Sequence, residues 1–177
     1  STQANLNNAY GQSKKSAEIR IENHSKARGI STVIYRLPGV FGKWCKPNYN
    51  SVVATFCNNI ATGVPVQIDD PTYILDLVYI DDVIDSFIGW LKGPSSDGIE
   101  FKTIDQVYNI TLGELAKQIQ EFAKSRKSLV SERVGTGFIR ALYSTYVSYL
   151  PRNKFEYPIP SHGDERGVFV EMLKTKD

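Results

Sequence analysis

The order of hydrophobic and polar residues in this chain changes repeatedly between a strand-like and a helix-like pattern. Short runs rich in β-branched and aromatic residues predict strands at residues 32–35, 64–68, 73–80, 107–110 and 167–173. Apolar residues at helical spacing predict helices at residues 10–28, 52–62, 81–91, 112–122 and 138–150. Strands that alternate with helices in this way are typical of an α/β fold with a parallel sheet.

Glycines and polar residues indicate where several of these elements begin and end. Gly29 and Gly63 follow two predicted helices, at the position where a left-handed residue commonly ends a helix. Residues 41–50 contain no regular pattern and are expected to form a loop. Asn50 or Ser51 is expected to cap the helix that follows this loop.

The composition predicts a soluble globular protein. Apolar residues make up 41% of the chain, charged residues make up 23%, and the net charge is +2. The charges are scattered, which argues against nucleic acid or a membrane as partner, and no apolar run is long enough to span a membrane. Cys45 and Cys57 lie in unrelated contexts, which favours a reduced, cytoplasmic protein. The only methionine is Met172, so Ser1 is expected to be an internal residue of a longer polypeptide.

Tyr10 and Lys14 are the first residues whose pattern indicates chemistry. Their spacing of four places a phenol and an ammonium on one face of a helix, about one turn apart. A nearby cation stabilises phenolate, so such a tyrosine can transfer a proton while a hydride moves to or from an adjacent carbon. Ser1 and Thr2 could supply a hydroxyl to the same oxygen. The pair alone is more typical of the start of an amphipathic helix with a solvated lysine.

Four segments in the same order resemble the extended short-chain dehydrogenase/reductase family, also called the NAD-dependent epimerase/dehydratase family. They are residues 1–4, the Tyr10/Lys14 helix, residues 35–42 and residues 78–83. Residues 41–51, 142–151 and 164–167 are similar, more narrowly, to the bifunctional members of capsule and O-antigen synthesis, which join a reductase domain to a C-terminal cupin.

The resemblance implies a division of the chain into parts of two domains. Residues 1–126 would be the C-terminal half of a Rossmann-type reductase domain, including its substrate-binding part. Residues 127–158 would be a linker and joining helix, with most of a polar stretch at 124–136 and the helix at 138–150. Residues 159–177 would begin the cupin. The Gly-rich loop that holds a dinucleotide does not occur in this sequence.

The resemblance also implies the reaction and its cofactor. A homodimeric enzyme would use NADPH, or NADH, to reduce C4 of a UDP-linked 4-keto-6-deoxy-N-acetylhexosamine. The product would be UDP-N-acetyl-6-deoxy-L-talosamine, on the route to UDP-N-acetyl-L-fucosamine. Tyr10 would protonate the C4 oxygen, Lys14 would bond the nicotinamide ribose, and Ser1, or else Thr2, would hydrogen-bond the sugar oxygen. These roles make Ser1, Tyr10 and Lys14 the catalytic residues, and Tyr10, Lys14, Arg36 and Pro38 the cofactor-binding residues.

The UDP diphosphate would lie against the loop and the start of the helix after it. Backbone N–H groups and the dipole of a helix N-terminus favour an anion there. The implied substrate-binding residues are Lys43, Trp44, Lys46, Asn48, Asn50 and Ser51. Two positions depart from the family pattern, because Gly39 replaces a usual asparagine and Leu75 replaces a frequent arginine.

Other readings of the same residues stay open. Another nucleotide-sugar epimerase of this family, or a non-catalytic sugar-nucleotide-binding or oligomerisation module, would carry similar segments. Asp81 and Asp82 could act as an acid/base pair or as helix caps, and Cys45 as a reactive thiol or a packed loop residue. Trp44 could contact substrate or close its loop. Tyr143, Tyr146 and Tyr149 favour an interface, whereas the isolated His24 and His162 predict no metal site.

Overall fold

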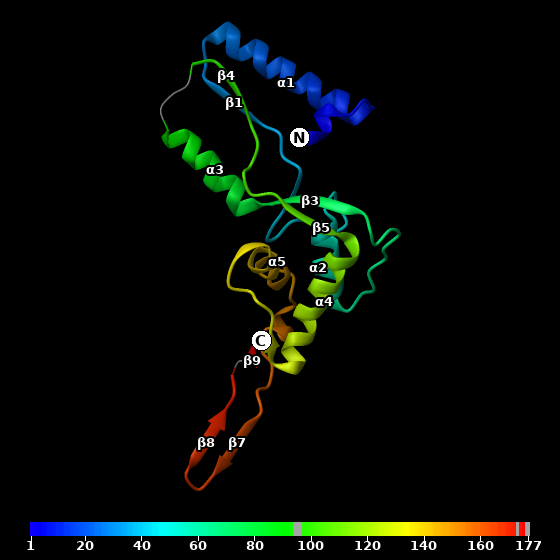
Figure 1. Cartoon of the computed structure of the whole chain (residues 1–177), viewed down its shortest axis with the longest axis vertical. Coiled ribbons are helices and arrows are strands. Elements are labelled where there is room, and N and C mark those ends of the chain that lie inside the picture. The colour runs from blue at the N-terminus through cyan, green and yellow to red at the C-terminus, as the bar shows by residue number, and fades with distance from the viewer. Residues whose placement is uncertain (94–96, 173, 176–177) are drawn as a thin grey trace. The chain divides into compact units, whose positions relative to one another are not determined.

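The computed structural model describes residues 1–93, 97–172 and 174–175, and Figure 1 labels its helices and strands. The chain divides into two units. The first contains Ser1–Val40 and Asp76–Asn109, and the second contains Phe41–Leu75 and Ile110–Asp177. Helices and strands occur in both, so the predicted α/β class is confirmed. Among the described residues, no helix has the length and apolar character needed to cross a membrane.

The first unit contains the predicted Tyr10/Lys14 helix. A 3-10 turn, η1 (Thr2–Asn5), precedes α1 (Ala9–Arg28), which ends at Gly29 in the left-handed conformation with φ of 61°, as the sequence predicts. The strand that follows is β1 (Thr32–Tyr35), as predicted. It pairs in parallel with β4 (Ile99–Lys102), a strand that the sequence pattern did not reveal. The two strands lie beside each other in Figure 1.

A hydrophobic cluster of the first unit lies at the start of α3 (Ile80–Lys92), next to the segments that follow β1 and β4. The buried side chains are Val78, Val83 and Ile104, and the partly buried Tyr35, Leu37 and Val40 pack against them. The ring of Tyr35 also lies 4.5 Å from that of Phe87 in α3, centroid to centroid. These contacts fix the end of β1, from which the chain leads to Arg36 and Pro38.

Three strands carry the chain between the two units. They are β2 (Gly39–Phe41), β3 (Ile74–Tyr79) and β5 (Tyr108–Thr111), and they form a sheet in the order β2-β3-β5. Strands β3 and β5 match predicted strands, whereas β2 lies where the sequence predicted the start of a loop. Gly39 fits close packing here, because a Cβ atom on it would approach Leu77 Cδ2 to 3.0 Å.

The second unit is built on three helices, α2 (Val52–Thr62), α4 (Leu112–Ser128) and α5 (Gly137–Val147), which contact one another. Their shared core includes Leu115, Phe122, Leu142 and Tyr146, each 2% exposed or less. Phe122 packs edge-on against Tyr143 at 5.1 Å between centroids and lies 5.9 Å from Tyr146. Two of the three tyrosines predicted to favour an interface thus pack between helices of their own unit.

Capping residues begin and end these helices as the sequence predicts. Ser51 caps α2, its Oγ accepting from the Ala54 N–H at 3.3 Å, and Gly63 ends this helix with φ of 85°. Thr111 caps α4 in a reciprocal arrangement with Glu114, in which each side chain bonds the other residue's backbone N–H. Such a capping box satisfies two donors that a helix start would otherwise leave unpaired.

The C-terminal part of the second unit consists of short elements. A 3-10 turn, η2 (Arg152–Lys154), follows α5, and β6 (Val130–Ser131) pairs in parallel with β9 (Lys174–Thr175). An antiparallel hairpin joins β7 (Ser161–Asp164) to β8 (Gly167–Val170), and all eight of its strand residues are exposed. The hairpin contains the first part of the predicted strand 167–173, whose last residue lies outside the described residues.

Several predicted boundaries were wrong. Residues 64–68 form no strand, and Pro65 in this stretch lacks the N–H that a strand interior needs. Helix α4 continues to Ser128, into the stretch predicted as linker, and α5 ends at Val147 rather than at residue 150. Helix α3 begins at Ile80 with Tyr79 as its N-cap and no side-chain cap, so Asp81 and Asp82 occupy its first turn instead. Carboxylates in the first turn still stabilise the helix, because they lie at the positive end of its dipole.

Candidate active site

Tyr10 and Lys14 lie on one face of the first turns of α1, as predicted. The Lys14 ammonium is 5.2 Å from the centroid of the Tyr10 ring. The Tyr10 side chain is 57% exposed. The phenol and the ammonium are therefore adjacent and open to a ligand.

Gly11 allows the segment after Ser1 to lie directly on this helix. A Cβ atom on Gly11 would meet the carbonyl oxygen of Leu6 at 2.2 Å and that of Gln3 at 2.5 Å, both of them backbone atoms that cannot rotate away. The Gly11 N–H donates to Asn8 Oδ1 at 2.7 Å, the hydrogen bond that caps the start of α1. The residue after Tyr10 is thus a point of close approach between α1 and the segment that contains η1.

The two candidate hydroxyls, Ser1 and Thr2, differ in their bonds. The Thr2 hydroxyl donates to the Leu37 carbonyl at 3.5 Å, and the Thr2 N–H donates to the same oxygen at 3.1 Å. Ser1 Oγ instead accepts from the Gln3 N–H at 3.3 Å, a bond that does not use the serine proton. The bond that Ser1 Oγ accepts leaves its proton unused, whereas Thr2 uses its own to hold η1 beside the segment after β1.

Arg36 is bound to two elements of the first unit. Its Nε lies 3.2 Å from Glu18 Oε1, its Nη2 lies 2.8 Å from Glu18 Oε2, and its Nη1 lies 3.2 Å from Asn5 Oδ1. The hydrogen bond to Glu18 is the largest cause that raises the pKa of Arg36. The guanidinium also lies 4.8 Å from the Phe101 ring centroid. Arg36 thus joins α1 to η1, while the predicted cofactor contacts of Arg36 and Pro38 stay predictions.

The predicted substrate residues all lie in the second unit, in a loop of residues 43–50 and at the start of α2. This 43–50 loop contains no helix or strand. Trp44, Asn48 and Asn50 have φ values of 62°, 56° and 55°, in the left-handed region that side chains disfavour. Trp44 is 81% exposed, so its ring does not close the loop by packing on this chain. Its role in substrate contact stays a prediction.

Hydrogen bonds hold this loop at both ends. At its end, the Asn48 N–H donates to Thr55 Oγ1 in α2 at 2.9 Å, next to the Ser51 cap. At its start, the Trp44 N–H donates to Ser148 Oγ at 3.3 Å, and the Tyr149 hydroxyl donates to the Cys45 carbonyl. Between the ends, the Lys46 ammonium lies 5.6 Å from the Tyr49 ring centroid. The loop therefore presents exposed cationic and aromatic side chains from a fixed base.

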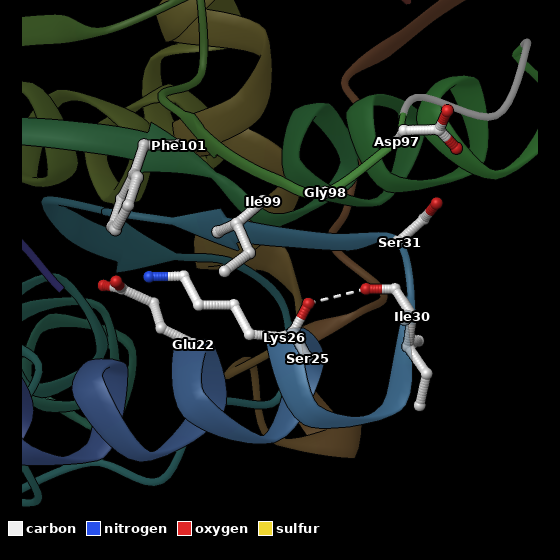
Figure 2. Close-up of a pocket in the computed structure, with 10 residues that line it drawn as sticks. Glu22, Ser25, Lys26, Ile30, Ser31, Asp97, Gly98, Ile99 and Phe101 are labelled. Carbon is white, nitrogen blue, oxygen red and sulfur yellow. Dashed lines mark hydrogen bonds between the residues drawn. The ribbon is translucent and has the colours of Figure 1, made fainter.

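A separate cavity lies at the other end of α1 (Figure 2). Its volume is about 660 Å³, and its lining includes Glu22, Ser25, Lys26, Ile30, Asp97 and Phe101. In Figure 2 the Lys26 ammonium points toward the Glu22 carboxylate, and Ser25 Oγ donates to the Ile30 carbonyl at 2.6 Å. Lys26 follows Tyr10 by sixteen residues, about 24 Å along a helix. The cavity is therefore distinct from the Tyr10 site.

The described part of the chain contains no cluster of metal ligands, and its two cysteines differ in burial. Within residues 1–93, 97–172 and 174–175, no three histidine, cysteine, aspartate or glutamate side chains gather as metal ligands. Cys45 and Cys57 are both free thiols. Cys57 is fully buried, and burial raises its pKa, which keeps it protonated and unreactive. Asp82 accepts from the Tyr108 hydroxyl at 3.4 Å.

Sequence reasoning missed several residues that shape the site. A glycine inside a helix costs about 1 kcal/mol relative to alanine, so Gly11 beside Tyr10 was a readable signal of close contact. Glu18 lies four residues after Lys14 on the same helix face, which favoured a pair with that lysine rather than with Arg36. Tyr149 is 104 residues from Cys45, and no local pattern predicts that contact.

The sequence matches one protein family and a curated relative. The NAD dependent epimerase/dehydratase family profile matches residues 1–110. The whole chain is 50% identical over 177 residues to UDP-2-acetamido-2,6-beta-L-arabino-hexul-4-ose reductase of Pseudomonas aeruginosa, of which it covers 47%. The chain thus spans about half the length of the curated relative that it matches.

Solved structures agree on the fold. The capsular polysaccharide assembling protein CapF of Staphylococcus aureus matches all of this chain with 40% identity and a TM-score of 0.90, and the match covers 48% of that protein. UDP-glucose 4-epimerase of Thermotoga maritima, solved with UDP-glucose, is 21% identical with a TM-score of 0.65 over 83% of this chain and 54% of its own. At that identity the likeness shows the fold alone. Together with the chain's helices and strands, these matches confirm the predicted Rossmann-type half-domain.

Proposed function

This chain belongs to the NAD dependent epimerase/dehydratase family, and we propose that it forms part of a longer nucleotide-sugar reductase. The proposed reaction is the NADPH-dependent reduction of C4 in a UDP-linked 4-keto-6-deoxy-N-acetylhexosamine, in capsular or O-antigen polysaccharide synthesis. The product is UDP-N-acetyl-6-deoxy-L-talosamine. The 50% identity to a protein named as a reductase of a UDP-linked 4-ketose supports this substrate class over a generic epimerase.

The observation that carries the proposal is the pairing of Tyr10 and Lys14 beside η1. An exposed phenol with an ammonium 5.2 Å from its ring centroid fits a nicotinamide cofactor and a carbonyl substrate, because both groups are open to ligands. The nicotinamide cofactor supplies a hydride to C4 when it is bound. Tyr10 donates the proton that the C4 oxygen then needs, and Lys14 stabilises the phenolate that remains. Ser1, with its hydroxyl proton available, orients the same oxygen.

The 43–50 loop supports the binding of the diphosphate part of the substrate. Lys43, Lys46 and the N-terminus of α2 at Ser51 place positive charge and backbone donors in one segment. Trp44 offers an exposed ring, and Asn48 and Asn50 offer amide groups, for the remaining contacts. These residues bind substrate in our proposal, while Arg36 and Pro38 lie on the cofactor side.

The proposal extends to the domain organisation and the setting of the protein. Residues 1–126 belong to the reductase, residues 127–158 join it to the next domain, and residues 159–177, with the β7–β8 hairpin, begin a cupin. The active protein is a homodimer, which sedimentation of the complete protein tests directly. The two free thiols favour the reducing cytoplasm as its location.

The decisive experiment is Tyr10→Phe in the complete protein. Loss of the general acid should lower kcat for UDP-4-ketose-dependent NADPH oxidation by about 100- to 10,000-fold. The Kd for NADPH should change by less than about twofold, because Lys14, Arg36 and Pro38 keep their proposed cofactor contacts. Tyr73→Phe is the matched control, since Tyr73 is 58% exposed and should leave kcat unchanged. Wild-type turnover in Tyr10→Phe would refute the proton-donor role, and absence of turnover in the unaltered protein would refute the reaction.

A further inference from the structure

Two neighbouring residues of the 43–50 loop are bonded to two neighbouring residues that follow α5. The Trp44 N–H donates to Ser148 Oγ, and the Cys45 carbonyl accepts from the Tyr149 hydroxyl, although each pair is 104 residues apart in sequence. All four residues belong to the second unit. The contact is therefore a specific connection between the loop and the end of a core helix.

The Ser148 half of this connection is continuous with the core of the unit. Ser148 Oγ accepts from Trp44 at 3.3 Å and donates to the Thr145 carbonyl at 2.7 Å. Thr145 is fully buried, and its own hydroxyl donates to the Ala141 carbonyl at 2.8 Å. The position of the Trp44 N–H is thus set by hydroxyls along the last turns of α5, which are held in turn by packing on α4.

The other half of the connection is the hydrogen bond from the Tyr149 hydroxyl, a donor that stays protonated. Burial is the largest cause that raises the pKa of Tyr149, so its hydroxyl keeps its proton at neutral and moderately alkaline pH. Because the acceptor is a backbone carbonyl, the bond positions the main chain at Cys45 whatever its side chain does. The Trp44 ring is 81% exposed, so packing of this side chain does not hold the loop start.

The connection matters because the loop backbone is not in a relaxed conformation. Trp44 has φ of 62°, which costs energy for a residue with a Cβ atom and persists only where surrounding contacts require it. The bonds from Ser148 and Tyr149 flank this residue on its N–H side and after its carbonyl. Both bonds can hold the loop start in this form, and the Phe41 ring just before the loop also packs on Phe138 of α5, at 5.8 Å between centroids.

We propose that Ser148 and Tyr149 are positioning residues for the sugar nucleotide: they hold the start of the 43–50 loop in the form that binds the UDP diphosphate. We call the Trp44–Ser148 and Cys45–Tyr149 hydrogen bonds the anchor of the loop. The substrate role of the loop rests on the proposed function, whereas the anchor itself does not. Neither residue touches substrate. Each acts through the backbone of Trp44 or Cys45.

The anchor itself is tested by hydrogen exchange in the complete protein without ligand. Tyr149→Phe removes one hydroxyl and leaves the ring in place, and Ser148→Ala removes the acceptor of the Trp44 N–H. Losing one such hydrogen bond should speed amide exchange in peptides covering residues 43–50 by about 2- to 10-fold. Tyr143→Phe is the matched control, because Tyr143 packs its ring on Phe122 and should leave loop exchange unchanged. Unchanged loop exchange in both anchor variants would overturn the anchor.

The role in substrate binding is tested with UDP as the probe, by calorimetry, and with steady-state kinetics. Tyr149→Phe should raise the Kd for UDP and the KM for the UDP-4-ketose by about 2- to 10-fold. The kcat at saturating sugar and the Kd for NADPH should change by less than about twofold, a split that general loss of structure would not give. Faster loop exchange with an unchanged Kd for UDP would overturn the substrate role and leave the anchor standing.

The same measurements separate failure of this inference from failure of the proposed reaction. If the unaltered protein binds UDP but turns over no UDP-4-ketose, the reaction is refuted, and the exchange and UDP-binding results still decide the positioning role. If the unaltered protein turns over substrate and the anchor variants match it in loop exchange, KM and Kd for UDP, only the present inference is refuted.

Discussion

Arg36 and Glu18 form a two-pronged ion pair, with Nη2 2.8 Å from Oε2 and Nε 3.2 Å from Oε1. The Glu18 side chain is 9% exposed, whereas that of Arg36 is 35% exposed. The carboxylate is thus the buried partner, about one turn along α1 from Lys14, and the arginine supplies the charge that compensates for its burial. Because Arg36 also bonds Asn5, one guanidinium holds η1 against the helix that carries Tyr10.

We expect Arg36→Met to destabilise the protein and to lower its activity. Removing the guanidinium leaves the Glu18 carboxylate buried without its fork of donors, which should cost about 1–3 kcal/mol in the free energy of unfolding. Urea unfolding of the complete protein measures this loss. Arg36→Lys keeps the charge but not the two-pronged geometry, so it should recover only part of the stability. Equal stability of all three proteins would show that the pair is incidental.

Gly11→Ala should separate η1 from α1. The new methyl group would lie 2.2 Å from the Leu6 carbonyl oxygen, so the backbone of the preceding segment has to move. A displacement of about 1 Å at a catalytic centre can cost about 100-fold in rate, and we expect kcat to fall by about 10- to 100-fold. The measurement is NADPH oxidation by the complete protein.

Gly89→Ala is the matched control for that substitution. Gly89 also lies within a helix, α3, but a Cβ atom there would meet nothing within 4 Å. It should leave kcat unchanged and stabilise the protein by about 0.5–1 kcal/mol. A Gly11→Ala enzyme as active as the Gly89→Ala enzyme would refute the close-approach argument.

The capping box of α4 should make part of the stability dependent on pH. Hydrogen bonds from the Thr111 hydroxyl, at 2.8 Å, and from its N–H, at 3.1 Å, lower the pKa of Glu114. A carboxyl whose pKa is lowered by folding stabilises the protein above its unfolded pKa, near 4.5, and loses that effect as the pH falls through the folded pKa. The urea midpoint of the unaltered protein should therefore be higher than that of Glu114→Gln at pH 7. The difference between the two midpoints should disappear below pH ~4. A difference that is constant with pH would contradict this assignment.

The two cysteines should differ sharply in their reaction with alkylating reagents. Cys57 is 0% exposed and its pKa is raised by burial, so the native protein should protect it, whereas Cys45 is partly exposed in its loop. We expect Cys45 to be labelled by iodoacetamide at least about ten times faster, as followed by peptide mass spectrometry. In denaturant the two rates should converge. Equal native rates would mean that the α2 core opens readily.

The elements that the sequence predicted well are those with local causes. Gly29 ends α1 and Thr111 begins α4 because each conformation depends on residues within one turn. Strands β2 and β4 were missed because three or four residues carry too little periodicity, and their formation depends on partners far along the chain. Residues 64–68 show the converse, since a strand-like run without a partner in the described chain forms no strand.

The candidate site also combines features with local causes and features that depend on residues far along the chain. The spacing of Tyr10 and Lys14 follows from helix geometry, so the sequence alone placed both groups on one face. Arg36 was expected to contact the cofactor, but its contacts with Glu18 and Asn5 join segments up to 31 residues apart and depend on the folded sheet. The support of the 43–50 loop by Ser148 and Tyr149 depends on tertiary structure to a still greater degree.

The exposed β7–β8 hairpin has a consequence for every stability measurement on this chain. A two-stranded hairpin that buries none of its eight strand residues gains almost nothing from the helical core of its unit. Its backbone amides should therefore exchange through local opening, at denaturant concentrations where α2, α4 and α5 are still folded. Unfolding of the isolated chain would then not be a single all-or-none event, and a single melting temperature would describe only the helices.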